Sequence, residues 1–409
     1  MKRRYGFLAG IILCMALPLP GASVAGEELS GELVITADGD RDAYDCIADA
    51  FMEKYPNVSV RIDRPTQEEM STDEFFQRMK LELMSGECGD IIASNYFGTE
   101  STHLDGIFED LYPYMDSDPE FHREDYFSSL YQVFETEGKL YQVMLYGQPV
   151  YLRLNRELLD RAGVEYPQEE ITFWELAEIY QQVKNAAGGT LYLMSHGSFD
   201  PLASLEYGYY VWNDAFATEE FEQYLEANHA MDYPEKGRLR WNMIDERIPA
   251  NSLCREVWCI SLEAMNVTNR LFSETDELTE AVLYKTAHGG VPLSSYACFS
   301  ISSFSRNKEL AWEFLKFAME DHDFSFFDVA AIPVNREKAE RVYDSAGIDE
   351  DVKKKLFSDY ELVNTKGSVD GMLGMSMEPV LENYYLYDLI SAEECAKQLA
   401  DRTYLYLNE

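Results

Sequence analysis

Residues 31–62, GELVITADGDRDAYDCIADAFMEKYPNVSVRI, contain the pattern of a strand, a polar turn, an amphipathic helix and a second strand. The apolar run at 32–37 predicts the first strand, and apolar residues at helical spacing predict a helix over 43–55. The run at 58–62 predicts the second strand, so the unit is typical of a parallel α/β sheet. In open parallel sheets ligands bind outside the carboxyl ends of the strands, and the acidic turn at 38–42 is therefore the first candidate for a binding edge.

The N-terminus has the pattern of an export signal. Basic residues at 2–4 precede an apolar run over 7–18, and Ser23-Val24-Ala25 forms a small-x-small cleavage site. The apolar run has only 12 residues, whereas a membrane-spanning helix needs roughly 20. A lipid anchor on Cys14 is disfavoured because Leu13 precedes it where a lipobox has a small residue. We therefore expect residues 1–25 to be a signal peptide cleaved near Ala25, and the mature protein to be periplasmic or extracellular.

Length and charge narrow the class of protein. The chain has 409 residues and 46% hydrophobic content, which is enough for two or three domains with buried cores. Its 74 acidic residues outnumber 34 basic ones, giving a formal net charge of −40. Nucleic acid and anionic membrane surfaces are poor partners for such a chain. The charge is compatible with a neutral or a cationic ligand.

The cysteines leave the disulfide state undecided. Seven are present and six would remain after export, a number that permits 15 connectivities. Cys254 and Cys259 are an odd number of residues apart, so on one strand they would face opposite sides and could not bond. Buried thiols acting as small apolar side chains are the favoured interpretation.

Further elements follow in an order typical of compact α/β lobes, with no internal repeat and no low-complexity linker. The alternating run up to Leu154 is too long for one strand and favours a crossing between two domains. Aromatic residues over 201–228 have helical spacing, which is more often a core pattern than a cofactor site. The patterns predict helices over 73–85, 156–162, 173–185 and 308–319, the last capped by Ser305, and strands over 89–93, 191–195, 256–262 and 297–302.

Several segments, taken in order, resemble the family 1 extracellular solute-binding proteins, the maltodextrin-binding-like receptors of carbohydrate ABC importers. The resemblance covers most of residues 31–340, and each segment is weak alone. The segments are FMEKYPNVSVRI (51–62), SGECGDIIAS (85–94), GKLYQVMLYGQPVYLRLNRELLDRAGVEYP (138–167) with TFWEL (172–176), FSISSFSRNKELAWEFLKFAM (299–319) and AAIPVNREKAE (330–340).

The resemblance implies an α/β, two-lobed periplasmic-binding-protein type II fold with a ligand cleft between the lobes. Lobe one would contain residues 31–145 and 291–334, and lobe two residues 146–290 and 335–409. The chain would cross between them at 145–150, near Gly289-Gly290 and near Ile332-Pro333. With this division lobe one has Cys46, Cys88 and Cys298, and lobe two has Cys254, Cys259 and Cys395. Three cysteines cannot all pair within one lobe, so we expect at least one free thiol in each.

The resemblance also implies a function. We expect a non-enzymatic, monomeric receptor that captures a carbohydrate, by inference an oligosaccharide, and delivers it to the membrane permease subunits of an ABC importer, without a cofactor. Polar and aromatic residues at strand exits and crossings match sugar hydroxyls and C–H faces. The candidate ligand-binding residues are Asp38, Asp40, Arg41, Asn95, Tyr96, Phe97, Tyr146, Gln148, His196, Trp212, Trp258, Glu263, Ser295 and Tyr296.

Other functions were weighed against the motifs. Asp38, Asp40, Asp42 and Asp49 occupy calcium-loop positions, but Ala43 stands where an EF-hand needs glycine, so a helix-capping, ligand-facing turn is favoured. The histidines lack zinc spacing, and neither GxSxG nor a P-loop is present. Ser305 and Lys308 match S-x-x-K without its companion motifs. A glycoside-active enzyme, an extracellular sensor subunit for a signalling receptor and a receptor for another small solute stay as alternatives.

Overall fold

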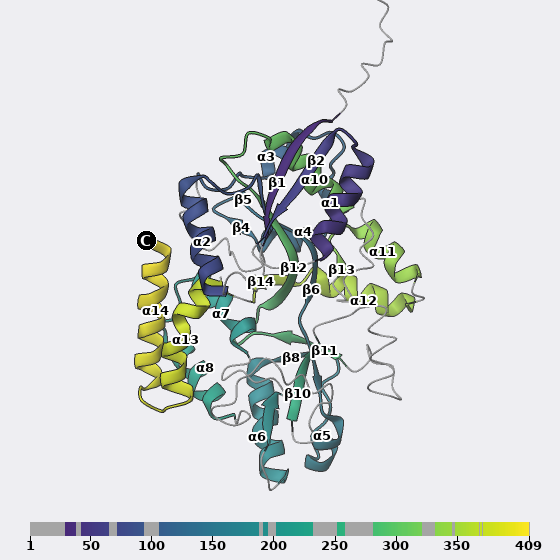
Figure 1. The fold of residues 1–409 in the computed structure, drawn as a ribbon. Helices are drawn as coiled ribbons and strands as arrows, with labels where there is room; N and C mark the ends of the chain where they lie inside the picture. Colours follow the sequence, from purple (N-terminus) through teal and green to yellow (C-terminus); the bar gives the residue numbers. More distant parts are fainter. Residues whose placement is uncertain are drawn as a thin grey trace, which may run out of the picture.

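The chain folds into two α/β lobes, each with its own sheet and its own buried core (Figure 1). The protein is described here from a computed structural model. The described residues are 29–37, 42–64, 72–93, 106–187, 191–194, 202–231, 252–257, 281–320, 332–345, 348–367, 369 and 371–408. The expected signal peptide, residues 1–25, lies outside them.

The sheet of the first lobe is mixed, with strand order β13-β6-β12-β3-β1-β2 and β14 paired beside β12. Strand β1 is parallel to both neighbours, and Ile35 pairs with Ile62 on one side and Ile91 on the other. The expected opening unit is therefore confirmed. The strands are β1 (Gly31–Ala37), β2 (Val58–Asp63), β3 (Ile91–Ala93), β6 (Val143–Pro149), β12 (Val291–Ile301), β13 (Ile332–Pro333) and β14 (Val363–Lys366).

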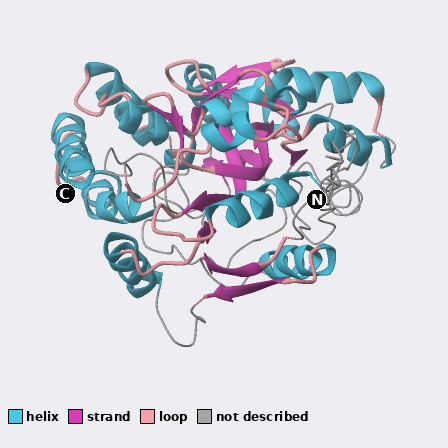
Figure 2. Cartoon of the chain, turned by 90° about the horizontal axis from the view of Figure 1, so that it is seen from above, coloured by secondary structure: helices cyan, strands magenta, loops and turns pink. Residues whose placement is uncertain are grey.

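Helices cover this sheet (Figures 1 and 2), and its apolar side chains are buried in the first core. Phe51 of α1 lies 5.1 Å, between ring centroids, from Phe314 of α10 in an edge contact, and both are fully buried. Such a buried ring contributes roughly 1.5–3 kcal/mol by leaving water. The elements are α1 (Asp42–Lys54), α2 (Thr72–Ser85), α3 (Tyr112–Ser117), η2 (Arg123–Asp125), α4 (Ser128–Gln132), the hairpin β4 (Glu135–Thr136) and β5 (Lys139–Leu140), α10 (Lys308–Glu320), α11 (Arg336–Ser345) and α12 (Glu350–Tyr360).

The second lobe contains the sheet β8-β11-β7-β10-β9 and a separate core. Tyr207 and Tyr210, from the aromatic segment, are buried in this core as the spacing predicts. The elements are β7 (Tyr151–Leu154), α5 (Arg156–Ala162), β8 (Glu170–Thr172), α6 (Phe173–Ala187), β9 (Tyr192–Met194), α7 (Ala203–Trp212), α8 (Glu219–His229), β10 (Ser252–Val257), β11 (Ala281–Lys285), α13 (Gly371–Tyr385) and α14 (Ala392–Asn408).

The Gly89-Asp90 pair explains why the third strand begins where it does. A Cβ at Gly89 would lie 2.6 Å from the carbonyl oxygen of Val34, so only glycine fits against β1. The Asp90 carboxylate accepts the Val34 N–H at 2.9 Å and the Ser305 hydroxyl at 2.6 Å. Ser305 also accepts the Asn307 N–H at 3.0 Å, and Lys308 pairs with Glu109 at 2.8 Å. The S-x-x-K match is thus structural, since Ser305 and Lys308 face different carboxylates.

The core packing places the third crossing later in the chain than expected. Residues 335–409 were assigned to lobe two, but Ala339, Tyr343 and Tyr360 pack in the first core. The second core resumes at Leu373. Amphipathic spacing shows that these helices cover a core, but it does not say which one. We therefore infer that lobe one extends through Lys366, and that the chain crosses at Val150, over 286–290 and between Lys366 and Gly371.

Among the described residues Cys46, Cys88, Cys298 and Cys395 form no disulfide, in agreement with the expectation of at least one such thiol in each lobe. Of the helices in the described residues, none is both long and apolar enough to span a membrane.

Candidate ligand site between the lobes

The carboxyl ends of strands from both sheets point toward the boundary between the lobes. In the first sheet Ala37, the last residue of β1, pairs with Ala93, the last residue of β3. Ala93 also pairs with Phe299 of β12, a strand that begins at Val291, next to the second crossing. Because β3 and β12 are antiparallel, β3 ends toward that crossing. In the second sheet Val257, the last residue of β10, pairs with Tyr151 beside the first crossing, and β9 is parallel to β10. The loops that leave these strands therefore start at the inter-lobe boundary.

Nine of the residues proposed from the sequence come after these strands in the chain. They lie outside the described residues, so their role as ligand contacts stays a prediction. These residues are Asp38, Asp40, Arg41, Asn95, Tyr96, Phe97, His196, Trp258 and Glu263.

Four other proposed residues lie on the two strands next to the crossings. Tyr296 pairs with Tyr146 and Ser295 pairs with Gly147 across β12 and β6, and Gln148 pairs with Ser294. Ser295 and Tyr296 therefore lie on the part of β12 between Leu293 and Phe299. Leu293 pairs with Lys366 of β14, and Phe299 pairs with Ala93 of β3. The side chains of Tyr146 and Gln148 are buried, which favours a role in core packing over ligand contact for these two residues.

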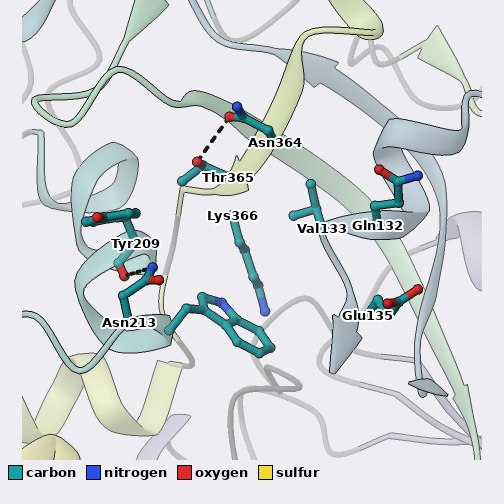
Figure 3. Close-up of a pocket in the computed structure, with 9 residues that line it drawn as sticks. Gln132, Val133, Glu135, Tyr209, Asn213, Asn364, Thr365 and Lys366 are labelled. Carbon is teal, nitrogen blue, oxygen red and sulfur yellow. Dashed lines mark hydrogen bonds between the residues drawn. The ribbon is translucent and has the colours of Figure 1, made fainter. Parts of the chain in front are cut away.

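A cavity of about 160 Å³ lies where the two lobes meet (Figure 3). The segment after α4 contributes from the first lobe, the carboxyl end of α7 contributes from the second, and β14 lies between them. Of the residues proposed from the sequence, Trp212 lines this pocket. The lining residues are Gln132, Val133, Glu135, Tyr209, Trp212, Asn213, Asn364, Thr365 and Lys366.

Helix α7 is fixed in place by contacts with two crossings. Gly208 donates its N–H to the Gly367 carbonyl oxygen at 3.0 Å. The buried Glu206 carboxylate accepts the Tyr284 hydroxyl at 2.5 Å and the Ala287 N–H at 3.0 and 3.1 Å. The Glu206 bonds fix the first turn of α7 to β11 and the second crossing, and the Gly208 bond fixes its middle to the residue after β14. Together they position the helix whose carboxyl end forms part of the pocket wall.

The ring of Tyr209 joins the pocket wall to the second crossing. It stacks on His288 with 3.3 Å between ring centroids and an interplanar angle of 15°. The Thr286 hydroxyl donates to the Gly290 carbonyl oxygen at 3.0 Å, so His288 Nε2, 3.1 Å from that hydroxyl, is the donor of their bond. Burial lowers the pKa of His288 to about 4, which keeps the imidazole neutral at pH 7.

The pocket presents both donors and acceptors. Trp212 Nε1 is buried and has no acceptor among the described residues. The Asn213 amide nitrogen donates to the Tyr209 carbonyl oxygen at 2.8 Å, which leaves its amide oxygen as an acceptor (Figure 3). Lys366 is 8% exposed and its side chain extends into the space between Asn213 and Glu135. This mixture of ring faces, amides and charged groups suits a small hydroxylated molecule.

Sequence reasoning missed most of this lining. Asn364-Thr365-Lys366 belongs to a short strand without an alternating apolar pattern, and the segment 132–135 ends a five-residue helix. The aromatic density of α7 was a usable signal, since it identified Trp212. Among the described residues no cluster of three or more His, Cys, Asp or Glu side chains could hold a metal ion. Asp38 and Asp40 of the calcium-like turn are outside that set.

Comparison with known proteins gives no sequence-level match and a clear structural one. No protein-family model matches the chain, and no curated protein matches it. The sugar-binding protein MalE from Xanthomonas citri superposes with a TM-score of 0.65 at 15% identity, over 92% of this chain and 98% of that one. An ABC substrate-binding protein from Listeria monocytogenes in complex with cycloalternan gives 0.61 at 16% identity, over 93% and 99%. A family 1 extracellular solute-binding protein from Alicyclobacillus acidocaldarius gives 0.60 at 15%, over 94% and 100%.

These matches extend over nearly the whole length of each protein. Because the sequence identity is so low, they establish the fold alone. They confirm the expected two-lobed fold. The chain has the periplasmic-binding-protein fold of MalE-like solute-binding proteins.

Proposed function

We propose that this protein is an exported solute-binding receptor that captures a carbohydrate between its lobes and delivers it to an ABC permease. The observation that carries the proposal is the pocket lined from both lobes at the crossings, in a chain with the fold of sugar-binding receptors. Two of the similar proteins were solved with a bound carbohydrate, cycloalternan in one and tagatose in the other, and sugars are the class that the lining chemistry favours.

Sugar binding would use the two kinds of group that meet at the boundary. Ring faces of Tyr209 and Trp212 suit the C–H faces of a pyranose. Amide and carboxylate groups suit its hydroxyls, and Trp212 Nε1 gains an acceptor when a hydroxyl reaches it.

Closure would follow from contacts made with both lobes. A ligand that touches α7 on one side and the 132–135 segment on the other binds the closed arrangement more tightly than an open one. Binding without turnover then suffices for transport, since the permease complex supplies the energy of ATP hydrolysis.

Ligand screening tests the proposal. Purified mature protein is melted with a panel of neutral and acidic mono- and oligosaccharides, and hits are titrated calorimetrically. We expect reversible stabilisation by at least one sugar, of about 2.7 kcal/mol at a ligand concentration one hundred times Kd. Chromatography of the same mixtures should show the sugar intact. A panel without any stabilising sugar contradicts carbohydrate binding, and appearance of products contradicts a pure receptor.

A further inference from the structure

The second crossing, residues 286–290, contains the pair Gly289-Gly290, which by sequence is typical of a flexible hinge. In the structure these residues form a tight turn. The Thr286 N–H and hydroxyl both donate to the Gly290 carbonyl oxygen, at 2.9 and 3.0 Å. The Gly289 N–H donates to the Thr286 carbonyl oxygen at 2.8 Å, and His288 Nε2 donates to the Thr286 hydroxyl at 3.1 Å. The turn is therefore closed by hydrogen bonds among its own residues.

The two glycines have structural roles in this turn. Gly289 has a φ of 87°, a left-handed conformation that L side chains rarely adopt. A Cβ on Gly290 would collide with the Thr365 hydroxyl oxygen of β14 and would lie 2.8 Å from His288 Nε2. Backbone conformation and close packing thus account for both glycines, and neither reason requires the turn to flex.

Two helices of the second lobe hold the turn by the main chain of Ala287. The buried Glu206 carboxylate of α7 accepts the Ala287 N–H at 3.0 and 3.1 Å, and Trp174 Nε1 of α6 donates to the Ala287 carbonyl oxygen at 2.8 Å. The same carboxylate accepts the Tyr284 hydroxyl of β11 at 2.5 Å. Breaking a buried hydrogen bond leaves a polar group unsatisfied, so separation of the turn from α7 is unfavourable.

A ring contact fastens the turn to the same helix one helical turn later. His288 stacks on Tyr209 with 3.3 Å between ring centroids and an interplanar angle of 15°. Helix α7 ends three residues further on, at Trp212, which lines the pocket together with Asn213. Anchors at two successive turns of a short helix fix the direction in which its carboxyl end points.

We propose that the second crossing is a rigid clamp rather than a hinge. The turn 286–290 and α7 move as one body with the second lobe, and Glu206 and His288 are the positioning residues that hold them together. The pocket wall at Trp212 and Asn213 is then in place before a ligand arrives, so binding does not have to order it. The effect on sugar affinity rests on the proposed receptor function, whereas the rigidity of the clamp does not.

Hydrogen exchange of the ligand-free protein tests the clamp without any ligand. Measured with residue resolution at pH 7, the amides of Thr286, Ala287 and Gly289 should exchange about a hundredfold or more slowly than in an unstructured chain. Flexing at Gly289-Gly290 would open the bonds that close the turn. Exchange of these amides near the unstructured rate in wild-type protein would therefore overturn the clamp.

Thr286→Val removes the hydroxyl that bridges His288 and Gly290, and it should speed exchange at Ala287 and Gly289 about tenfold. Thr218→Val is the matched control. It removes a hydroxyl bond to a carbonyl oxygen, that of Ala215 at 2.7 Å, before α8 in the same lobe, and it should leave exchange in the turn unchanged.

Sugar affinity tests the positioning role of His288. Maltose, tagatose and cycloalternan are titrated calorimetrically into each variant. His288→Ala removes the ring under Tyr209 and should weaken binding of a sugar that binds wild type by about tenfold, because binding must then order α7. His288→Phe keeps a ring there and should restore most of the affinity.

His229→Ala is the matched control, because it removes a histidine ring that contacts Tyr384, 4.8 Å between centroids, elsewhere in the second lobe. It should leave the affinity unchanged. If a sugar binds wild type and His288→Ala equally, the positioning role is overturned and the receptor function stands. If none of the three sugars binds wild type, their capture by this receptor is contradicted, and hydrogen exchange still decides the clamp.

Discussion

Gly208 of α7 lies directly against the main chain of Lys366 in β14. A Cβ added to Gly208 would be 1.8 Å from the Lys366 carbonyl oxygen, and the Gly208 N–H already donates to the next carbonyl oxygen at 3.0 Å. The contact is between backbone atoms of the second lobe and of a crossing strand. No side-chain movement can therefore relieve a substitution here.

Gly208→Ala should destabilise the protein by about 1–3 kcal/mol or more, because the helix must move away from β14. Gly374→Ala in α13 is the matched control, since its added Cβ would meet only Val369 at 3.5 Å. Glycine to alanine in a helix without a clash stabilises by about 0.5–1 kcal/mol. Urea unfolding of both variants measures the contrast. Equal stability of the two would show that α7 does not pack against β14 this closely.

Tyr151→Phe should weaken the link between the lobes. The Tyr151 hydroxyl, at the start of β7, donates to the buried Asp359 carboxylate at 2.8 Å, and Lys355 donates to the same oxygen at 2.8 Å. Loss of this buried bond should cost about 1–2 kcal/mol in denaturant unfolding. Tyr114→Phe, which removes a half-buried bond to Glu109 inside the first lobe, should cost less. A larger loss in the control would argue against a special role for Asp359.

Stability should fall between pH 6.5 and pH 4 in part because of His288. Its pKa is lowered by burial from the ordinary value of 6.5 to about 4. The unfolded chain therefore takes up this proton first as the pH falls, and protonation favours unfolding over that range.

His288→Phe keeps a ring against Tyr209 without the titrating group, so the drop in Tm from pH 7 to pH 5 should be smaller than in wild type. His122→Gln, at an exposed position, should leave the wild-type drop unchanged. An unaltered drop in His288→Phe would mean that other groups carry the acid sensitivity.

Trp258→Ala and Tyr296→Ala should each weaken sugar binding without unfolding the protein. Tyr296 lies on β12 opposite Tyr146, and Trp258 is the next residue in the sequence after Val257, the last residue of β10. Truncating an aromatic platform removes contact area with the sugar face. Calorimetric titration with the sugar found by screening measures the loss, and Tyr404→Ala on the exposed face of α14 provides the control. Unchanged affinity in both site variants would mean that the cleft has been placed wrongly.

Thiol counting on denatured, unreduced protein should find at least four reactive groups. Cys46, Cys88, Cys298 and Cys395 are free in the structure, and burial raises the pKa of the Cys88 thiol, which slows its reaction in the native state. The count should be taken in native and denatured protein. Fewer than four thiols after denaturation would require a disulfide at one of these four cysteines, none of which is bonded in the part of the chain that the structure describes.

Much of the fold follows from local sequence patterns. The helix expected over 156–162 has those bounds in the structure, and the one expected over 308–319 ends one residue later. The opening strand, helix and strand also form where apolar spacing places them. These elements were predictable because periodicity and terminating residues act within one turn or one strand.

Other features depend on contacts that no local pattern encodes. The helices α11 and α12 are amphipathic by sequence, yet only their packing shows that they cover the first core rather than the second. The pocket arises in the same way, because Trp212, Lys366 and Glu135 are far apart in sequence and meet only when α7 crosses β14. The sequence by itself determined the order of strands and helices and the loops at their ends. The tertiary structure alone decided which core each helix covers and which side chains share the inter-lobe space, since both depend on long-range packing.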